Sequence, residues 1–248
     1  MSVTASFQTV PVSAPPADLR LRTGRIAALL FACAAVMTVA GFFVNIAIHQ
    51  ILPSPEDDLA RVLARFDLGH EPSVPAWFSS GVLLFDAAML LLIGAAARKA
   101  GEPFAWHWLG LGFVFVALSV DEAALFHEMV DTALGSVLQT DGFLLFPWVL
   151  AGGGFAALVG LVYLRFLLWL PRRFALLFVA SGALYVGGAV GMELFSANAI
   201  DRYGLASTAH AITQTIEEGM EMAGAILFFH SLGLYWTHRH GPMRLWLR

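Results

Sequence analysis

Six apolar runs constrain this chain more than any other feature, because each is close to the ~20 residues that an α-helix needs to cross a bilayer. They lie at about residues 26–48, 77–97, 104–125, 142–169, 174–195 and 213–236. Only 13% of the residues are charged, against roughly 25% in soluble domains. The sequence therefore predicts an all-α integral membrane protein, a bundle of about six transmembrane helices.

Basic residues predict how this bundle is oriented. Six crossings place both termini on one side, and eleven of the fourteen Lys and Arg residues fall on that side. Only Arg61, Arg65 and Arg202 fall on the other side. Because Lys and Arg are enriched in cytoplasmic loops, we expect both termini in the cytoplasm and a multi-pass protein of the cell (inner) membrane.

The remaining segments predict no second folded domain. Residues 1–19 are rich in Ser, Thr, Pro and Ala, which is typical of a disordered tail. Residues 20–248 are expected to form a single transmembrane domain. Within it, Ser54-Pro55-Glu56-Asp57 has the pattern of a helix start, and apolar residues at helical spacing follow. We expect a short amphipathic helix at about residues 55–68 on the outer membrane surface.

Acidic residues gather on the side opposite the termini, where fifteen of the eighteen Asp and Glu residues fall. Asp121, Glu193 and Glu217 belong to three different helices and reach a similar depth near the outer edge of the hydrocarbon. Glu217, Glu218 and Glu221 lie within an arc of about 100° on one helix. The sequence therefore predicts that this glutamate face points toward the helices that carry Asp121 and Glu193.

A second acidic segment poses a geometric problem. Asp121, Glu122, His127 and Glu128 are spaced so that a regular helix cannot aim all four at one point. Either the helix unwinds near residues 123–126, or only some of these side chains converge. A single acid at a helix end is an ordinary interfacial charge. Many like charges repel one another, however, unless they share protons or a cation.

Carboxylates combined with one or two histidines form an oxygen-rich ligand set that suits iron, manganese or zinc. We therefore expect a divalent metal site near the outer face. Its candidate ligands are Asp121, Glu122, His127, Glu128, Glu193, Glu217, Glu218, Glu221 and His210. The chain has neither the Glu-x-x-His pairs of di-iron bundles nor the His-Glu-x-x-His of zinc proteases. Asn45 and His49, at the outer end of the first run, are interpreted as interfacial residues.

Three function classes stay open. The first is a metal-dependent oxidoreductase or hydrolase that acts on a lipid-soluble substrate. The second is a small proton- or cation-coupled transporter or channel, favoured by Asp86, which lies halfway along the second run and is a candidate for a proton path. The third is an assembly subunit of a larger membrane complex. The net charge of −4 argues against nucleic acid, so the expected partners are the lipid bilayer and a lipid-soluble small molecule.

Overall fold

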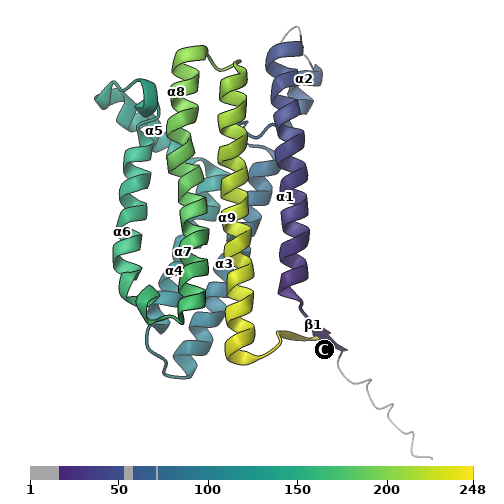
Figure 1. The fold of residues 1–248 in the computed structure, drawn as a ribbon, viewed down its shortest axis with the longest axis vertical. Helices are drawn as coiled ribbons and strands as arrows, with labels where there is room; N and C mark the ends of the chain where they lie inside the picture. Colours follow the sequence, from purple (N-terminus) through teal and green to yellow (C-terminus); the bar gives the residue numbers. More distant parts are fainter. Residues whose placement is uncertain (1–16, 53–57, 71, 248) are drawn as a thin grey trace, which may run out of the picture.

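The computed structural model describes residues 17–52, 58–70 and 72–247, and these residues form a bundle of helices that stand side by side (Figure 1). The long helices are α1 (Thr23–Ile46), α3 (Val74–Lys99), α4 (Ala105–Ala124), α6 (Trp148–Trp169), α7 (Arg172–Val186) and α9 (Thr208–His240). Shorter helices are α2 (Asp58–Leu63), α5 (Phe126–Leu138) and α8 (Glu193–Tyr203), with 3-10 turns at Ala64–Phe66 and Gly142–Leu144. Two π-helical segments extend the long helices, Ala47–Ile51 after α1 and Gly187–Met192 between α7 and α8.

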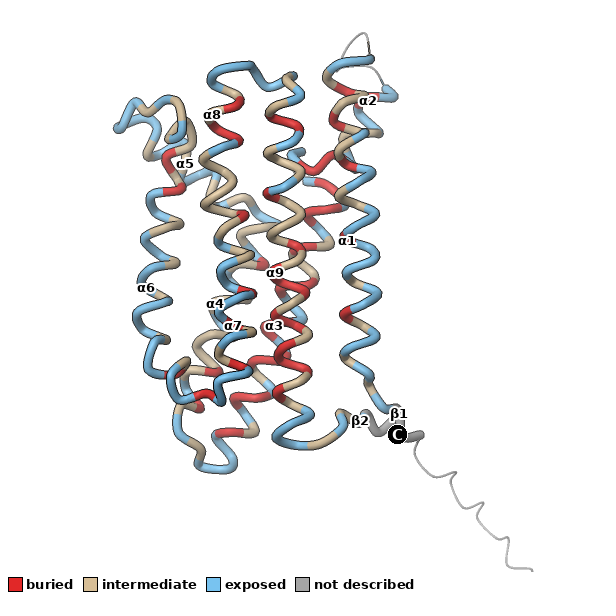
Figure 2. Tube along the Cα trace, in the orientation of Figure 1, coloured by how far each residue is buried: buried red, intermediate tan, exposed pale blue. Residues whose placement is uncertain are grey.

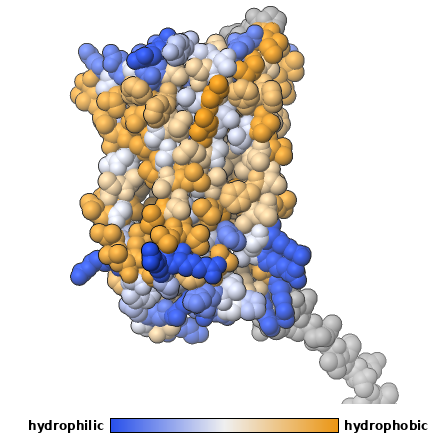
Figure 3. All heavy atoms as spheres, viewed as in Figure 1, coloured by the Kyte–Doolittle hydropathy of each residue, from blue (hydrophilic) through white to orange (hydrophobic). Residues whose placement is uncertain are grey.

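Five helical segments are long and apolar enough to cross a membrane. They are Thr23–Ile51, Val74–Lys99, Ala105–Ala124, Trp148–Trp169 and Arg172–Tyr203. Apolar side chains form a broad band around the middle of the molecule, and hydrophilic side chains gather at its two ends (Figure 3). The protein is therefore an all-α, multi-pass membrane protein, as the apolar runs indicate.

The sixth expected run forms α9, which is 33 residues long and packs against α1, α3 and α7. It is not among the five apolar segments, because Glu217, Glu218, Glu221 and His230 make it more polar than the others. Polar groups are less costly in a helix that is surrounded by protein than in one that faces lipid. The crossing of the membrane by α9 stays a prediction.

Both termini of the described chain meet at one end of the bundle. Strand β1 (Ala17–Arg20) pairs antiparallel with β2 (Arg244–Leu247), with Ala17 opposite Leu247. The backbone of residues 17–19 is held in this ladder, and the disordered tail before it stays a prediction. Residues 1–16 lie outside the described residues. The end that carries the strands is called the basic end, since Arg98, Lys99, Arg172 and Arg173 border its helices.

The helix expected at residues 55–68 is present in shorter form as α2 and the 3-10 turn that follows it. Leu59, Val62 and Phe66 are exposed along this segment, as an amphipathic surface helix requires. Its position on the membrane surface stays a prediction, and the Ser54–Asp57 start lies outside the described residues.

The tightly packed core lies toward the basic end, between α3, α4 and α9 (Figure 2). Leu90, Trp108, Ile226 and Leu232 are fully buried there. In contrast, α6 buries only Val149 and Phe166, and α5 buries none of its residues. The opposite end, called the acidic end, is therefore packed less tightly, and a cavity lies there.

Candidate functional site

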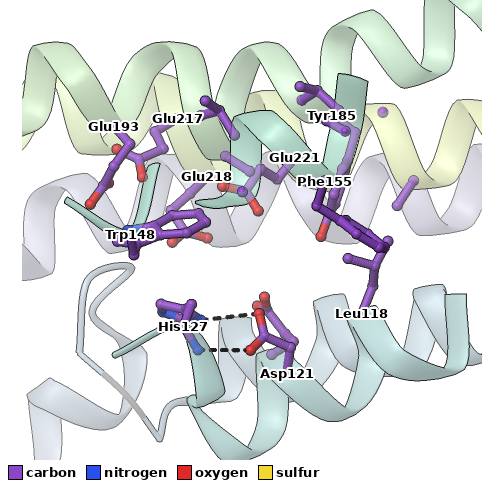
Figure 4. Close-up of a pocket in the computed structure, with 18 of the residues that line it drawn as sticks. Leu118, Asp121, His127, Trp148, Phe155, Tyr185, Glu193, Glu217, Glu218 and Glu221 are labelled. Carbon is purple, nitrogen blue, oxygen red and sulfur yellow. Dashed lines mark hydrogen bonds and ion pairs between the residues drawn. The ribbon is translucent and has the colours of Figure 1, made fainter. Parts of the chain in front are cut away.

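A cavity of ≈ 1250 Å³, called the chamber, lies between α4, α6, α7 and α9. It is larger than the ~300–1,000 Å³ of typical small-molecule sites. All nine side chains that the sequence proposes as metal ligands line it, and so do Asn45, His49, Asp67 and His70. Figure 4 shows Asp121 and His127 on one side and Glu193, Glu217, Glu218 and Glu221 on the other.

The Asp121 side is shaped by a break between α4 and α5. Leu125 adopts a left-handed conformation with φ of 59°, which ends α4 and lets the chain turn into α5. The backbone N–H of His127 then donates to Asp121 Oδ1 at 2.9 Å, and His127 Nδ1 lies 3.2 Å from Asp121 Oδ2. The helix therefore unwinds within the 123–126 segment, the first of the two alternatives, and Asp121 caps the first turn of α5.

The glutamate side is shaped by a close helix crossing. A Cβ at Gly188, in the π-helical segment, would lie 2.8 Å from the backbone O of Glu217. Only glycine lets the π-helical segment approach α9 this closely. The glutamate face of α9 is thereby held against this segment and turned to the chamber, so it points inward as the arc of about 100° predicts.

Glu217 is the most buried of these glutamates, with 8% of its surface exposed. The Ser196 hydroxyl donates to Glu217 Oε2 at 2.6 Å. Glu193, at the start of α8, lies beside Glu217 in the chamber lining (Figure 4). Two carboxyl groups from α8 and α9 are therefore brought together.

One part of the chamber, called the acidic lobe, is lined by carboxyl groups and by no basic Lys or Arg side chain among the described residues. Among the described lining residues there is no Lys or Arg, whereas nine carry carboxyl groups. These are Asp67, Asp121, Glu122, Glu128, Asp131, Glu193, Glu217, Glu218 and Glu221. Such a lobe attracts cations and repels anions.

The rest of the chamber is apolar and forms a second lobe toward the basic end. Its walls include Leu118, Phe155, Val159, Tyr163, Phe178 and Phe228. Along α6 the lining runs from Trp148 to Leu167, which spans about 28 Å at ~1.5 Å per residue. This length is close to the ~30 Å thickness of the bilayer hydrocarbon.

Two expectations find no support in this geometry. Asp86 is fully buried, neither of its oxygens has a hydrogen-bond partner in the described part of the chain, and it does not line the chamber. Nowhere in residues 17–52, 58–70 and 72–247 are three or more His, Cys, Asp or Glu side chains arranged to hold a metal ion. Metal binding therefore stays a prediction.

Sequence reasoning missed several polar residues of the chamber. Asp67 and His70 lie in the loop that folds back from α2 to α3, and His49 was interpreted as interfacial. Asp131 accepts a hydrogen bond from the backbone N–H of Trp148 at 3.1 Å and so ties α5 to α6. No local pattern marks these residues, because their proximity depends on how the loops fold back over the helix ends.

Comparison with known proteins places the chain in a family. Residues 26–236 match the family model described as "Domain of unknown function (DUF8692)". No curated protein and no solved structure matches the chain. The family match contains every residue that lines the chamber. Since it spans most of the sequence, the chain belongs to the DUF8692 family.

Proposed function

We propose that this multi-pass membrane protein binds a lipid-soluble molecule with a positively charged head group. The observation that carries the proposal is the union, in one chamber that runs about 28 Å along α6, of a carboxylate-rich lobe without Lys or Arg in its described lining and an apolar lobe. The head group lies among the carboxylates, and the apolar part lies along α6. We also propose that the chain crosses the inner membrane six times, with both termini in the cytoplasm.

Electrostatics favours a cation in the acidic lobe. Carboxylates gathered in a partly desolvated space repel one another, and a shared proton or a bound cation relieves that repulsion. Glu193 and Glu217 lie side by side, and the chamber holds further carboxyl groups on α4, α5 and α9. The rings of Trp148 and Tyr185 also line this region (Figure 4). An ammonium group gains from such aromatic faces as well as from the negative charge.

The Asp121–His127 pair supports chemistry on the bound molecule. A carboxylate that holds one nitrogen of an imidazole fixes the ring and makes it a better base, as in many general acid–base sites. The ring of His127 lies 5.2 Å from that of Trp148, within the region proposed for the head group. The pair therefore supplies an acid–base group where an enzyme would need one.

A divalent ion among the nine candidate ligands is a second candidate, as part of a metal-dependent oxidoreductase or hydrolase. The observation that favours it is again Asp121 beside Nδ1 of His127, since metal-binding histidines are commonly oriented by a carboxylate on their other nitrogen. The transporter alternative has less support, because Asp86 does not line the chamber. No described contact specifically favours the assembly-subunit alternative.

Binding of three molecules of equal chain length tests the main proposal: a long-chain amine, the matching alcohol and the matching carboxylic acid. Competition against a radiolabelled amine is measured on the full chain in lipid nanodiscs. We expect the amine to bind about tenfold or more tightly than the alcohol, equivalent to ~1.4 kcal/mol. The carboxylic acid should bind least. Equal affinity for the amine and the acid would contradict the proposal.

Two variants complete this experiment. The double change Glu218→Gln and Glu221→Gln should lower the affinity for the amine about tenfold or more, because it removes two charges of the acidic lobe. The control is Asp201→Asn, since Asp201 is exposed on α8 and does not line the chamber. An equal loss in the control would mean that general surface charge, rather than the chamber, attracts the amine.

A further inference from the structure

Three side chains meet at the mouth of the chamber from segments far apart in the sequence. His49 lies in the π-helical segment Ala47–Ile51, Asp67 follows the 3-10 turn Ala64–Phe66, and His210 lies in the first turn of α9. All three line the chamber. Single π-helical turns occur preferentially at functional sites. This set is separate from the Asp121–His127 pair and from the glutamate face of α9.

Asp67 is a buried carboxyl group without a strong counter-charge. It is 4% exposed, and Asn45 Nδ2 donates to its two oxygens at 3.2 and 3.4 Å. His49 Nε2 lies 4.0 Å from Asp67 Oδ2, beyond hydrogen-bond distance. The described chamber lining offers no Lys or Arg. Buried charges in proteins are paired or bind metal ions. A buried carboxylate at Asp67 is therefore expected to bind a cation.

His210 supplies an independent sign of a missing ligand. Its residue surface is 4% exposed, and its Nδ1 atom is buried without a hydrogen-bond partner in the described structure. Its imidazole interacts electrostatically with His49, Asp67 and Glu193, so these groups are neighbours. A buried nitrogen without a partner is unfavourable unless something binds it.

We propose that His49, Asp67 and His210 bind a divalent transition-metal ion, of the zinc or iron(II) class, at the mouth of the chamber. Two histidines and one carboxylate are the protein ligands of many catalytic zinc sites and of non-haem iron(II) sites. Such sites keep open positions for water or substrate. Because all three side chains line the chamber, an ion that they hold would be reached from it. This inference goes beyond the proposed binding of an amphiphile and does not depend on it.

The three ligands must move closer together when the ion binds. Ligand atoms bonded to zinc at about 2.0–2.2 Å lie about 3.4 Å apart in a tetrahedral site. The 4.0 Å between His49 and Asp67 is about 0.6 Å wider. No group of three such side chains among the described residues is already arranged to hold an ion, so His210 must also approach this pair on binding. Asn45 acts as a positioning residue, since it fixes the orientation of the Asp67 carboxylate.

The test uses the full chain, purified in detergent and stripped of metal with a chelator. Zn²⁺ binding is measured by calorimetry, and Co²⁺ serves as a spectroscopic probe because ligand geometry determines its visible absorption. We expect one equivalent of tightly bound ion. Asp67→Asn and His210→Gln should each weaken binding about 100-fold or more, and Asn45→Ala about 10- to 100-fold. Asp67→Asn preserves the shape of the side chain, so it reports on ligation even if His210→Gln disturbs folding.

Matched controls locate the ion. His127→Gln, in the other acid–histidine pair, should retain one equivalent with unchanged Co²⁺ absorption. If His127→Gln loses the ion while Asp67→Asn keeps it, or if no equimolar ion binds, the inference is wrong. The Glu218→Gln, Glu221→Gln variant separates the two proposals, since it should lose the amine and keep the ion.

Discussion

Replacing Gly224 with alanine tests how closely α7 and α9 pack beside the chamber. A Cβ at Gly224 would lie 2.6 Å from the backbone N of Tyr185 and 2.9 Å from its Cα. Because both are backbone atoms, neither can rotate away, and the two helices must move apart. Overpacking of this kind costs about 1–3 kcal/mol. Alanine also recovers about 1 kcal/mol of helix propensity relative to glycine, so the variant alone would understate the clash.

Gly182→Ala is the matched control, because Gly182 lies on α7 and a Cβ there meets no described atom within 4 Å. The propensity gain is common to both variants, so their difference isolates the clash. We expect Gly224→Ala to be less stable than Gly182→Ala by about 1–3 kcal/mol, or about 5- to 150-fold in the unfolding equilibrium. Unfolding by SDS, followed by circular dichroism in detergent, measures this difference. Equal stability of the two variants would refute the close crossing.

Three further predictions follow from single contacts and from charge. Ser196→Ala should lower the free energy of unfolding by about 1.5–3 kcal/mol, because a buried hydrogen bond to the Glu217 carboxyl is lost; an unchanged SDS midpoint would contradict this contact. Asp86→Leu should stabilise the protein by about 1–3 kcal/mol, since it removes a buried carboxyl group without a described hydrogen-bond partner. A lower SDS midpoint in this variant would show that the Asp86 carboxyl group does have a hydrogen-bond partner. Alkaline phosphatase fused after Arg248 should be inactive and a fluorescent reporter there active, because the basic residues predict a cytoplasmic C-terminus.

The membrane helices could be predicted from sequence because their signal is local. Each apolar run maps onto one helix, and most boundaries shift by only a few residues. The fourth run begins later than expected, because Pro147 lacks a backbone N–H and α6 starts at Trp148. The fifth continues through the π-helical segment and α8 to Tyr203, beyond the point where its apolar residues end.

The candidate site could be predicted only where the helices are regular. The wheel of α9 correctly turns Glu217, Glu218 and Glu221 to one side, since that helix is continuous through all three. The helical-wheel projection of α4 shows that a regular helix cannot bring the side chains of Asp121 and His127 together. It does not show that Leu125 would break the helix and let Asp121 cap α5. That outcome depends on a backbone conformation that no residue pattern marks.

The two π-helical segments explain why His49 was missed and why Glu193 could be predicted from its depth but not from a helical wheel. An α-helix advances by about 100° per residue, whereas a π-helical turn closes i→i+5 hydrogen bonds and so inserts an extra residue. Every side chain after the insertion is rotated relative to the regular wheel. Glu193 directly follows Gly187–Met192, and His49 lies within Ala47–Ile51. A wheel continued from α7 or α1 therefore aims these two side chains in the wrong direction. The turn of Glu193 into the chamber depends on helix packing, above all on the close approach of Gly188 to α9.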